Sequence, residues 1–196
     1  IALKKEVNDI KGISTTYNNI AIVFINQGKY EEALRYSQTA LKISDSLKNE
    51  EGVVRAYNNI GIYFLSQKKY KEALTYFERS ISENKSQAPS EYGIVYNNIG
   101  NVYSDTKQYE SALSYYLKSL KIRLDLNETQ FFSLIYTNLG DVYIKLKQYK
   151  KALYYTTQAL KFAKEHGNKM AMQNAYQTLG TCYEEMKQYE VAVNPN

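Results

Sequence analysis

The sequence predicts an all-α fold, a right-handed superhelical solenoid of antiparallel helical hairpins. A tyrosine-led phrase, "YNNIG" in two copies and related in three more, recurs after 40, 39, 40 and 40 residues, led by Tyr17, Tyr57, Tyr96, Tyr136 and Tyr176. Apolar residues within each unit follow the helical period, and only short polar joints interrupt them. Because one hairpin cannot cover its own apolar face, the units are expected to stack.

Each unit divides into two helices. In the first half of the second unit, "YNNIGIYFLSQKKY", an apolar stripe with helical spacing is formed by Tyr57, Ile60, Phe64 and Leu65. In the second half, "YKEALTYFERSIS", a similar stripe is formed by Tyr70, Ala73, Leu74, Phe77 and Ile81. Strand alternation fits neither half, so both are predicted to be amphipathic helices.

The joints set the direction of the helices. Inside a unit the joint is a few polar residues, such as "SQKK" at 66–69, and so short a connection forces the two helices to be antiparallel. Between units, segments such as "KNEEG" at 48–52 and "HGNK" at 166–169 carry the Gly and Asn of turns and helix caps.

The whole chain, 1–196, is predicted to be one repeat domain. Residues 1–12 are the tail of a preceding repeat, followed by repeats at 14–53, 54–92, 93–132 and 133–172 and by a partial repeat at 173–196, a first helix with the beginning of a second. Because the chain starts inside a second helix and without Met, we expect it to be a fragment of a larger protein.

Composition narrows the class of protein. The chain is 44% apolar and 23% charged, which is typical of a globular protein, and its net charge is +5. No run approaches the roughly 18 apolar residues of a membrane span, so no membrane segment is expected. The lysines are spread through every repeat without a block of like charge, so the sequence does not predict a nucleic-acid tail.

The repeated residues resemble the tetratricopeptide repeat family, whose pattern is an aromatic, Leu-Gly, Tyr, Ala, an aromatic and Ala. In the second unit these places are held by Tyr57, Ile60, Gly61, Phe64, Ala73, Phe77 and Ser80. The unit is near 40 residues and lacks the closing Pro, which lets the second helix run on. Such long units are similar to those of kinesin light chain, of the spindle-orientation adaptors and of segments in bacterial signalling proteins.

Small residues and tyrosines are interpreted as scaffold. A small side chain where the two helices of a hairpin cross is predicted at Ala33, Ala73, Ala112, Ala152 and Ala192, and on the first helix at Ala21, Gly61, Gly100, Gly140 and Gly180. Seventeen of the 21 tyrosines fall at four repeat positions, which favours packing over base stacking, so a nucleic-acid partner is not expected.

No enzyme, cofactor or metal motif is found. The sequence has no phosphate loop, nucleophile elbow or zinc helix, and its acidic residues are scattered. The single cysteine, Cys182, takes a position held elsewhere by valine and is expected to be buried. His166 precedes a glycine at a helix end, where an imidazole can meet the helix dipole. We therefore predict a non-enzymatic protein.

The candidate ligand site is the concave face, lined by first helices. Positions two before and two, five and nine after the opening tyrosine share one side of each first helix. The groove residues chosen there are Asn19, Ile22, Arg55, Asn59, Ile62, Asn98, Asn101, Asp105, Asn138, Asp141 and Lys145. The groove becomes acidic toward the C-terminus, which would suit a partner carrying Lys or Arg.

The second asparagine of the phrase is the main candidate in this groove, as a column at Asn19, Asn59, Asn98 and Asn138. An amide can pair with the backbone of a peptide, and the resemblance to kinesin light chain and the spindle adaptors implies that use. The alternative is that the amide bonds locally or bridges neighbouring helices. The first asparagine is expected to flank the groove.

The leading hypothesis is a scaffold that binds a peptide or partner helix. The alternative is a sensory or regulatory segment of a bacterial histidine kinase or transcription regulator, which relays signals or mediates dimerisation. Copies are expected to associate through the exposed end repeats. The compartment stays open, cytoplasmic or, for a sensor protein, periplasmic.

Overall fold

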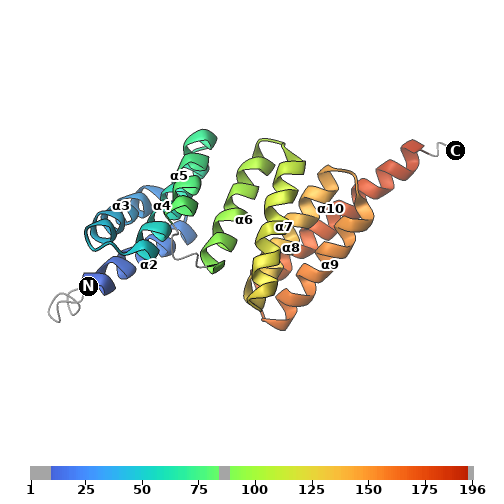
Figure 1. Ribbon diagram of the computed structural model, residues 1–196. Coiled ribbons are helices and arrows are strands. Elements are labelled where there is room, and N and C mark those ends of the chain that lie inside the picture. The colour runs from blue at the N-terminus through green and yellow to red at the C-terminus, as the bar shows by residue number, and fades with distance from the viewer. Residues whose placement is uncertain (1–9, 84–88, 194–196) are drawn as a thin grey trace. The chain divides into compact units, whose positions relative to one another are not determined.

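The computed structural model describes the backbone of residues 10–83 and 89–193 and the side chains of 12–83 and 89–187. This described part contains nine α-helices, one short 3-10 helix and no strand (Figure 1). The all-α prediction is therefore confirmed. The residues cluster into two compact units, the first ending at Val102 and the second beginning at Tyr103.

The first unit consists of two hairpins and most of a further helix. Helix α2 (Ile10–Asn26) pairs with α3 (Tyr30–Ser46), and α4 (Glu50–Ser66) pairs with α5 (Tyr70–Ser82); α6 (Pro89–Asp105) belongs to this unit up to Val102. Helix α4 also packs against α2 and α3, so the first two repeats share a core.

The second unit begins with the end of α6. It continues through α7 (Tyr109–Asp125), the 3-10 helix η1 (Thr129–Phe131), α8 (Phe132–Lys145), α9 (Tyr149–Glu165) and α10 (Lys169–Val193). Helix α8 is central, because α7, α9 and α10 all pack against it. Its buried Leu139 and Val142 join Tyr116 of α7 and Cys182 of α10 in one apolar core.

Three first helices start within described residues, and each begins one to four residues before the residue at which its repeat was expected to start. Helix α4, for example, starts at Glu50 where the boundary was expected at 54, and α10 starts at Lys169 where it was expected at 173. The reason is that a helix resumes as soon as the preceding turn is complete, before the first residue of the apolar stripe is reached.

The turns between helices share one geometry that the residue types did not predict. At the end of α4, Lys68 has φ of 56°, its N–H donates to the Leu65 carbonyl, and the N–H of Lys69 donates to the Phe64 carbonyl. This is the Schellman arrangement, which usually places glycine at the left-handed residue. The same backbone bonds recur around Gly28, Lys48, Lys107, Asn127, Lys147 and Gly167.

The tyrosines of the hairpins pack on one another. The Tyr76 ring lies 6.2 Å from that of Tyr57 and 5.1 Å from that of Phe64, centroid to centroid, and is nearly parallel to the latter. The Tyr155 ring is held in the same way by Tyr136 and Tyr143. These contacts confirm that the repeated tyrosines at these positions build the scaffold.

Close packing of the helices holds for most of the predicted small residues. Four of the five alanines are fully buried, whereas the side chain of Ala192 lies outside the described residues. A Cβ on Gly61 would lie 2.5 Å from the Phe77 ring, and one on Gly140 would lie 2.3 Å from the Thr156 hydroxyl. The prediction is wrong for Gly180, where a Cβ would meet nothing within 4 Å.

Helix α10 explains the difference at Gly180. The partial repeat at 173–196 was expected to hold a first helix and the beginning of a second, but α10 continues without a break to Val193. A lysine in the left-handed conformation costs roughly 1 to 2 kcal/mol, and no described second helix packs on α10 to offset that cost. Its Tyr176 and Tyr183 are accordingly 53% and 60% exposed, unlike their counterparts in the hairpins.

Candidate functional site

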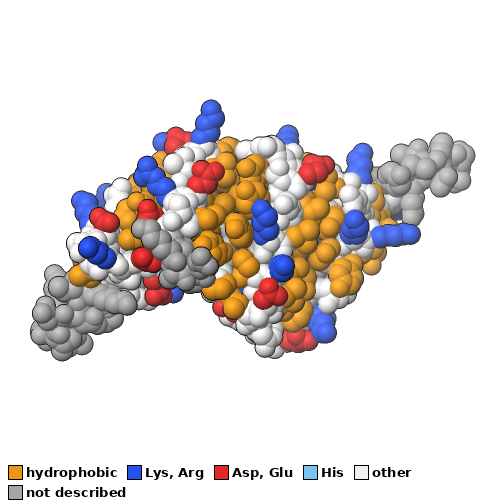
Figure 2. Space-filling view, viewed as in Figure 1, with side chains coloured by type: hydrophobic (Ala, Val, Ile, Leu, Met, Phe, Trp, Pro, Cys, Tyr) orange, Lys and Arg blue, Asp and Glu red, His pale blue; other side chains and the backbone are white. Residues whose placement is uncertain are grey.

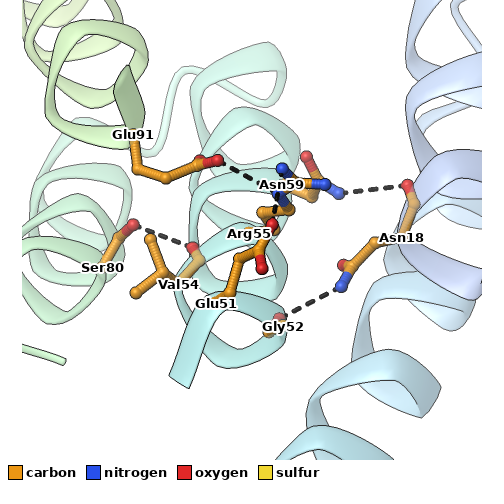
Figure 3. A network of polar contacts seen from close by, with 8 residues as sticks. All are labelled: Asn18, Glu51, Gly52, Val54, Arg55, Asn59, Ser80 and Glu91. Atoms are coloured by element: carbon orange, nitrogen blue, oxygen red, sulfur yellow. Dashed lines mark hydrogen bonds and ion pairs between the residues drawn. The ribbon is translucent and has the colours of Figure 1, made fainter. Parts of the chain in front are cut away.

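The second asparagine of the phrase has different surroundings in different repeats. Asn19 is exposed, whereas Asn59, at the same position of the next repeat, is 2% exposed. The Asn59 amide points from α4 toward α2 and donates to the backbone carbonyl of Asn18 at 3.5 Å (Figure 3). In this structure Asn59 therefore connects two repeats and has almost no surface to offer a ligand.

The first asparagine is buried rather than beside a groove, which corrects the expectation for it. Asn18, Asn58 and Asn97 are all less than a tenth exposed. The Asn18 amide donates to the carbonyl of Gly52 at 3.1 Å, across to α4 (Figure 3). The amide of Asn98 donates to the side-chain oxygen of Asn58 at 2.9 Å. Neighbouring first helices approach closely enough for these amides to lie between them.

Arg55, predicted to face the groove, is held within the first unit. Its guanidinium lies 2.8 Å from Glu51 of the same helix and 3.1 Å from Glu91 of α6 (Figure 3). Ser80 of α5 donates to the Val54 carbonyl beside it at 2.8 Å. These bonds connect α4, α5 and α6, and the two ion pairs engage Nε and one terminal nitrogen of Arg55.

The remaining predicted residues of the first-helix face are at least partly accessible. Ile22 is 42% exposed, while Ile62 and Asn101 are half-buried. Asp105 and Lys145 are exposed and belong to the second unit. On the face drawn in Figure 2, basic and acidic side chains are interspersed with apolar ones, so no patch of a single charge dominates it.

The second unit contains a pocket of about 540 Å³ between α8 and α10. Its walls include six positions of the predicted stripe, namely Leu134, Asn138, Asp141, Asn174, Thr178 and Thr181. The walls are completed by Gln130, Phe131, Ser133, Thr137, Asn168, Met170, Ala171 and Gln177. A cavity of this size with few charged groups has the dimensions of a small-ligand or side-chain site.

Asp141 has a distinct electrostatic environment in this pocket. Its side chain is exposed to solvent, yet the surrounding walls remove part of its hydration, and this desolvation raises the pKa of its carboxyl above the ordinary value. A hydrogen bond from the Thr178 hydroxyl, at 2.9 Å, and the charge of Lys145 lower the pKa without outweighing the burial. The charged carboxylate is therefore only partly compensated.

One wall of the pocket rests on a buried charge that sequence reasoning missed. Arg123 of α7 is 1% exposed, forms an ion pair with Glu128 and lies 4.0 Å from the centre of the Phe131 ring. A signal was present, because the same repeat position holds the small buried residues Ser44 and Ala163 in other units. An arginine at such a position calls for a nearby carboxylate, here five residues ahead.

The contacts of Cys182 and His166 are those of residues with a structural role. Cys182 is fully buried, as predicted, and burial raises the pKa of its thiol. His166 lies at the end of α9, with Nδ1 2.9 Å from the Phe162 carbonyl and Nε2 3.1 Å from the Thr129 hydroxyl. Among the described residues, no three His, Cys, Asp or Glu side chains gather as metal ligands would.

None of the described helices combines the length and apolar character needed to span a membrane.

A family model for the tetratricopeptide repeat matches residues 12–82, 91–165 and 131–195. No curated protein matches the sequence. The family matches together cover most of the chain.

Solved structures with the same fold include three from bacteria and archaea. BtubC (BKLC) from P. vanneervenii superposes with a TM-score of 0.66 at 23% identity, covering 81% of this chain and 66% of that one. Aspartyl phosphate phosphatase F from Bacillus subtilis gives 0.77 at 16%, covering 92% and 49%. A signal transduction ATPase with numerous domains and a tetratricopeptide repeat sensor, from Pyrococcus horikoshii, gives 0.63 at 21%, covering 86% and 25%.

These likenesses confirm the fold class, an all-α repeat solenoid. The chain spans between a quarter and two thirds of the length of those three proteins.

Proposed function

Because the chain belongs to the tetratricopeptide repeat family, we propose that it is a non-enzymatic interaction module that holds a peptide or a helix of a protein partner against its first helices. Members of the family are generally protein-binding modules. The observation that carries the proposal is the pocket between α8 and α10, which lies between two neighbouring first helices.

The walls of the pocket suit a peptide. Several are amides and hydroxyls, which can pair with a peptide backbone without selecting one side chain, and among these Asn174 and Gln177 are exposed. Exposed apolar side chains stand beside them, with Leu134 at 52% and Met170 at 73%. An apolar contact with polar groups around it is the usual composition of a binding surface.

The structure changes which asparagines support the proposal. Asn138 lines the pocket, and Asn19 is exposed on α2. Asn59, by contrast, has its amide occupied between α2 and α4, so its replacement would test packing rather than binding. The proposed binding residues are therefore the accessible members of the stripe.

The test uses random peptides displayed on phage and selected on the intact chain. Asn174→Arg would place a long charged side chain in the pocket, and we expect it to weaken binding of the selected peptides at least tenfold, about 1.4 kcal/mol. Ser114→Arg is the matched control, because it adds the same charge at an exposed position of α7 outside the pocket walls. Equal binding by both variants would refute the placement of the site.

A second proposal is that the chain is a sensory or regulatory segment of a larger bacterial signalling protein. It is supported by one similar structure, which is described as a signal transduction ATPase with a tetratricopeptide repeat sensor and of which this chain spans 25%. The coding sequence around this segment tests it directly. A kinase core or DNA-binding helix-turn-helix next to the repeats would support a relay, and a chain without an output domain would exclude it.

A further inference from the structure

The pocket between α8 and α10 has a single formal charge in its walls. Of its fourteen lining residues only Asp141 is ionisable, and the others are amides, hydroxyls and apolar side chains. Among the described residues no ion pair reaches the Asp141 carboxylate, although Lys145 stands one turn further along α8. The electrostatic preference of the pocket therefore depends on one group.

A residue of α10, on the other side of the pocket, holds the Asp141 carboxylate of α8 in position. One of its oxygens accepts the hydroxyl of Thr178, which is 6% exposed and therefore has little freedom to move. A carboxylate has acceptor capacity well beyond one hydrogen bond. The second oxygen is left available to a ligand in the pocket.

Any group that fills the pocket removes further water from Asp141. An apolar ligand would leave the charge buried without compensation, and an acidic ligand would add like-charge repulsion. A cationic group would instead replace the lost hydration with a charge-assisted hydrogen bond. The walls thus discriminate among ligands by charge.

The apolar part of the pocket sets the shape of that cation. Leu134 lies two turns before Asp141 on α8, roughly 10 Å along the helix axis, and Met170 lies on α10. Both offer exposed apolar surface. Lysine and arginine combine an apolar stem with a charged end, and they commonly lay the stem on such surface.

We propose that this pocket accepts one long cationic side chain, lysine or arginine, from the bound partner, with its stem against Leu134 and Met170 and its charged end at Asp141. The inference rests on the proposed function, because the side chain belongs to a partner segment. The chain itself carries a net charge of +5, so the attraction is local to the pocket and does not come from the overall field.

The experiment is an NMR titration of the intact, isotope-labelled chain with three capped amino acids: Nα-acetyl-lysine methylamide, its norleucine analogue and its glutamate analogue. We expect the lysine probe to shift the amide signals of Asn138, Asn174 and Thr178 with a Kd of about 1 mM, near −4 kcal/mol, and at least tenfold tighter than norleucine. The glutamate probe should not bind. No shift with the lysine probe at about 20 mM, twenty times that Kd, overturns the proposal.

Two variants decide whether Asp141 is responsible. Asp141→Asn should abolish the preference for lysine over norleucine, and Asp125→Asn, which removes an exposed carboxylate of α7 outside the stripe and the pocket walls, should leave it unchanged. An equal loss in both variants contradicts the proposal. Asparagine has the size of aspartate and keeps an oxygen that can accept the Thr178 hydroxyl at this exposed position, so Asp141→Asn should fold as well as the parent.

A failure of this inference can be told apart from a failure of the proposed function. If selected peptides lose binding to Asn174→Arg but tolerate norleucine in place of lysine or arginine, the proposed peptide site is supported and the proposed recognition of a cationic side chain is refuted. If the lysine probe binds through Asp141 while no selected peptide responds to Asn174→Arg, recognition of a cationic side chain is supported and the proposed peptide site is refuted.

Discussion

Between α2 and α4 of the first unit, asparagine side chains occupy the space between the helices, whereas between α8 and α10 of the second unit the corresponding positions surround a pocket. Both pairs are first helices of neighbouring repeats. At two of these positions the side chains differ in length and in the contacts that they make. Arg55 and Asn59 on α4 correspond to Asn174 and Thr178 on α10.

The difference shows that the same arrangement of helices can leave the space between neighbouring first helices either filled by side chains or open as a pocket. Asn59 reaches a backbone carbonyl of the preceding repeat, and Arg55 extends to two carboxylates. The shorter Thr178 reaches only the side chain of Asp141, and Asn174 remains exposed at the mouth. Asn59 therefore fills space between α4 and α2, whereas the shorter Thr178 leaves a pocket open between α10 and α8.

The largest expected effect concerns the helix crossings of the two units. Gly61→Ala should lower the free energy of unfolding by about 1 to 3 kcal/mol, because the new methyl overlaps the Phe77 ring. Gly180→Ala, at the same repeat position, should raise it by roughly 1 kcal/mol, because α10 has open space there and alanine favours a helix. Urea unfolding followed by circular dichroism measures both, and a similar loss in the two variants would contradict the open face of α10.

The second expected effect concerns the asparagine side chains between α2 and α4. Asn59→Ala removes the donor to the buried Asn18 carbonyl and should cost about 1 to 2 kcal/mol. Asn19→Ala, at the exposed equivalent position, should change stability by less than about 0.5 kcal/mol. The same unfolding experiment compares them. If the two variants are equally stable, Asn59 does not hold α4 to α2.

The smallest expected effect concerns the turns. Lys147→Gly should stabilise the chain by about 0.5 to 1 kcal/mol, because Lys147 has φ of 56° and glycine adopts that conformation without strain. Lys187→Gly, at the equivalent position inside the continuous α10, should destabilise by a similar amount. Thermal unfolding distinguishes the two signs. A stabilising Lys187→Gly would show that α10 breaks there in solution.

Much of the fold follows from residue period alone. The recurring tyrosine and alanine set the register of the hairpins, and the rings of Tyr57, Phe64 and Tyr76 meet where that register places them. The site was less predictable. The stripe positions 134, 138 and 141 line the pocket, but Asn59 at the same register as Asn138 is buried. Period identifies the side of a helix on which a residue lies and not how closely the next helix approaches it.

The sequence by itself determined the helices, their antiparallel pairing and the side chains of the packed scaffold, because these depend on local period and on joints too short for any other path. Only the tertiary structure decided that lysines take the left-handed turns, that Arg123 is buried with Glu128, and that a pocket opens beside Asp141. Lysine is not the residue that prefers the left-handed turn, Arg123 is buried only because Glu128 and Phe131 contact it, and the pocket needs side chains from two repeats, so the residue period predicts none of the three.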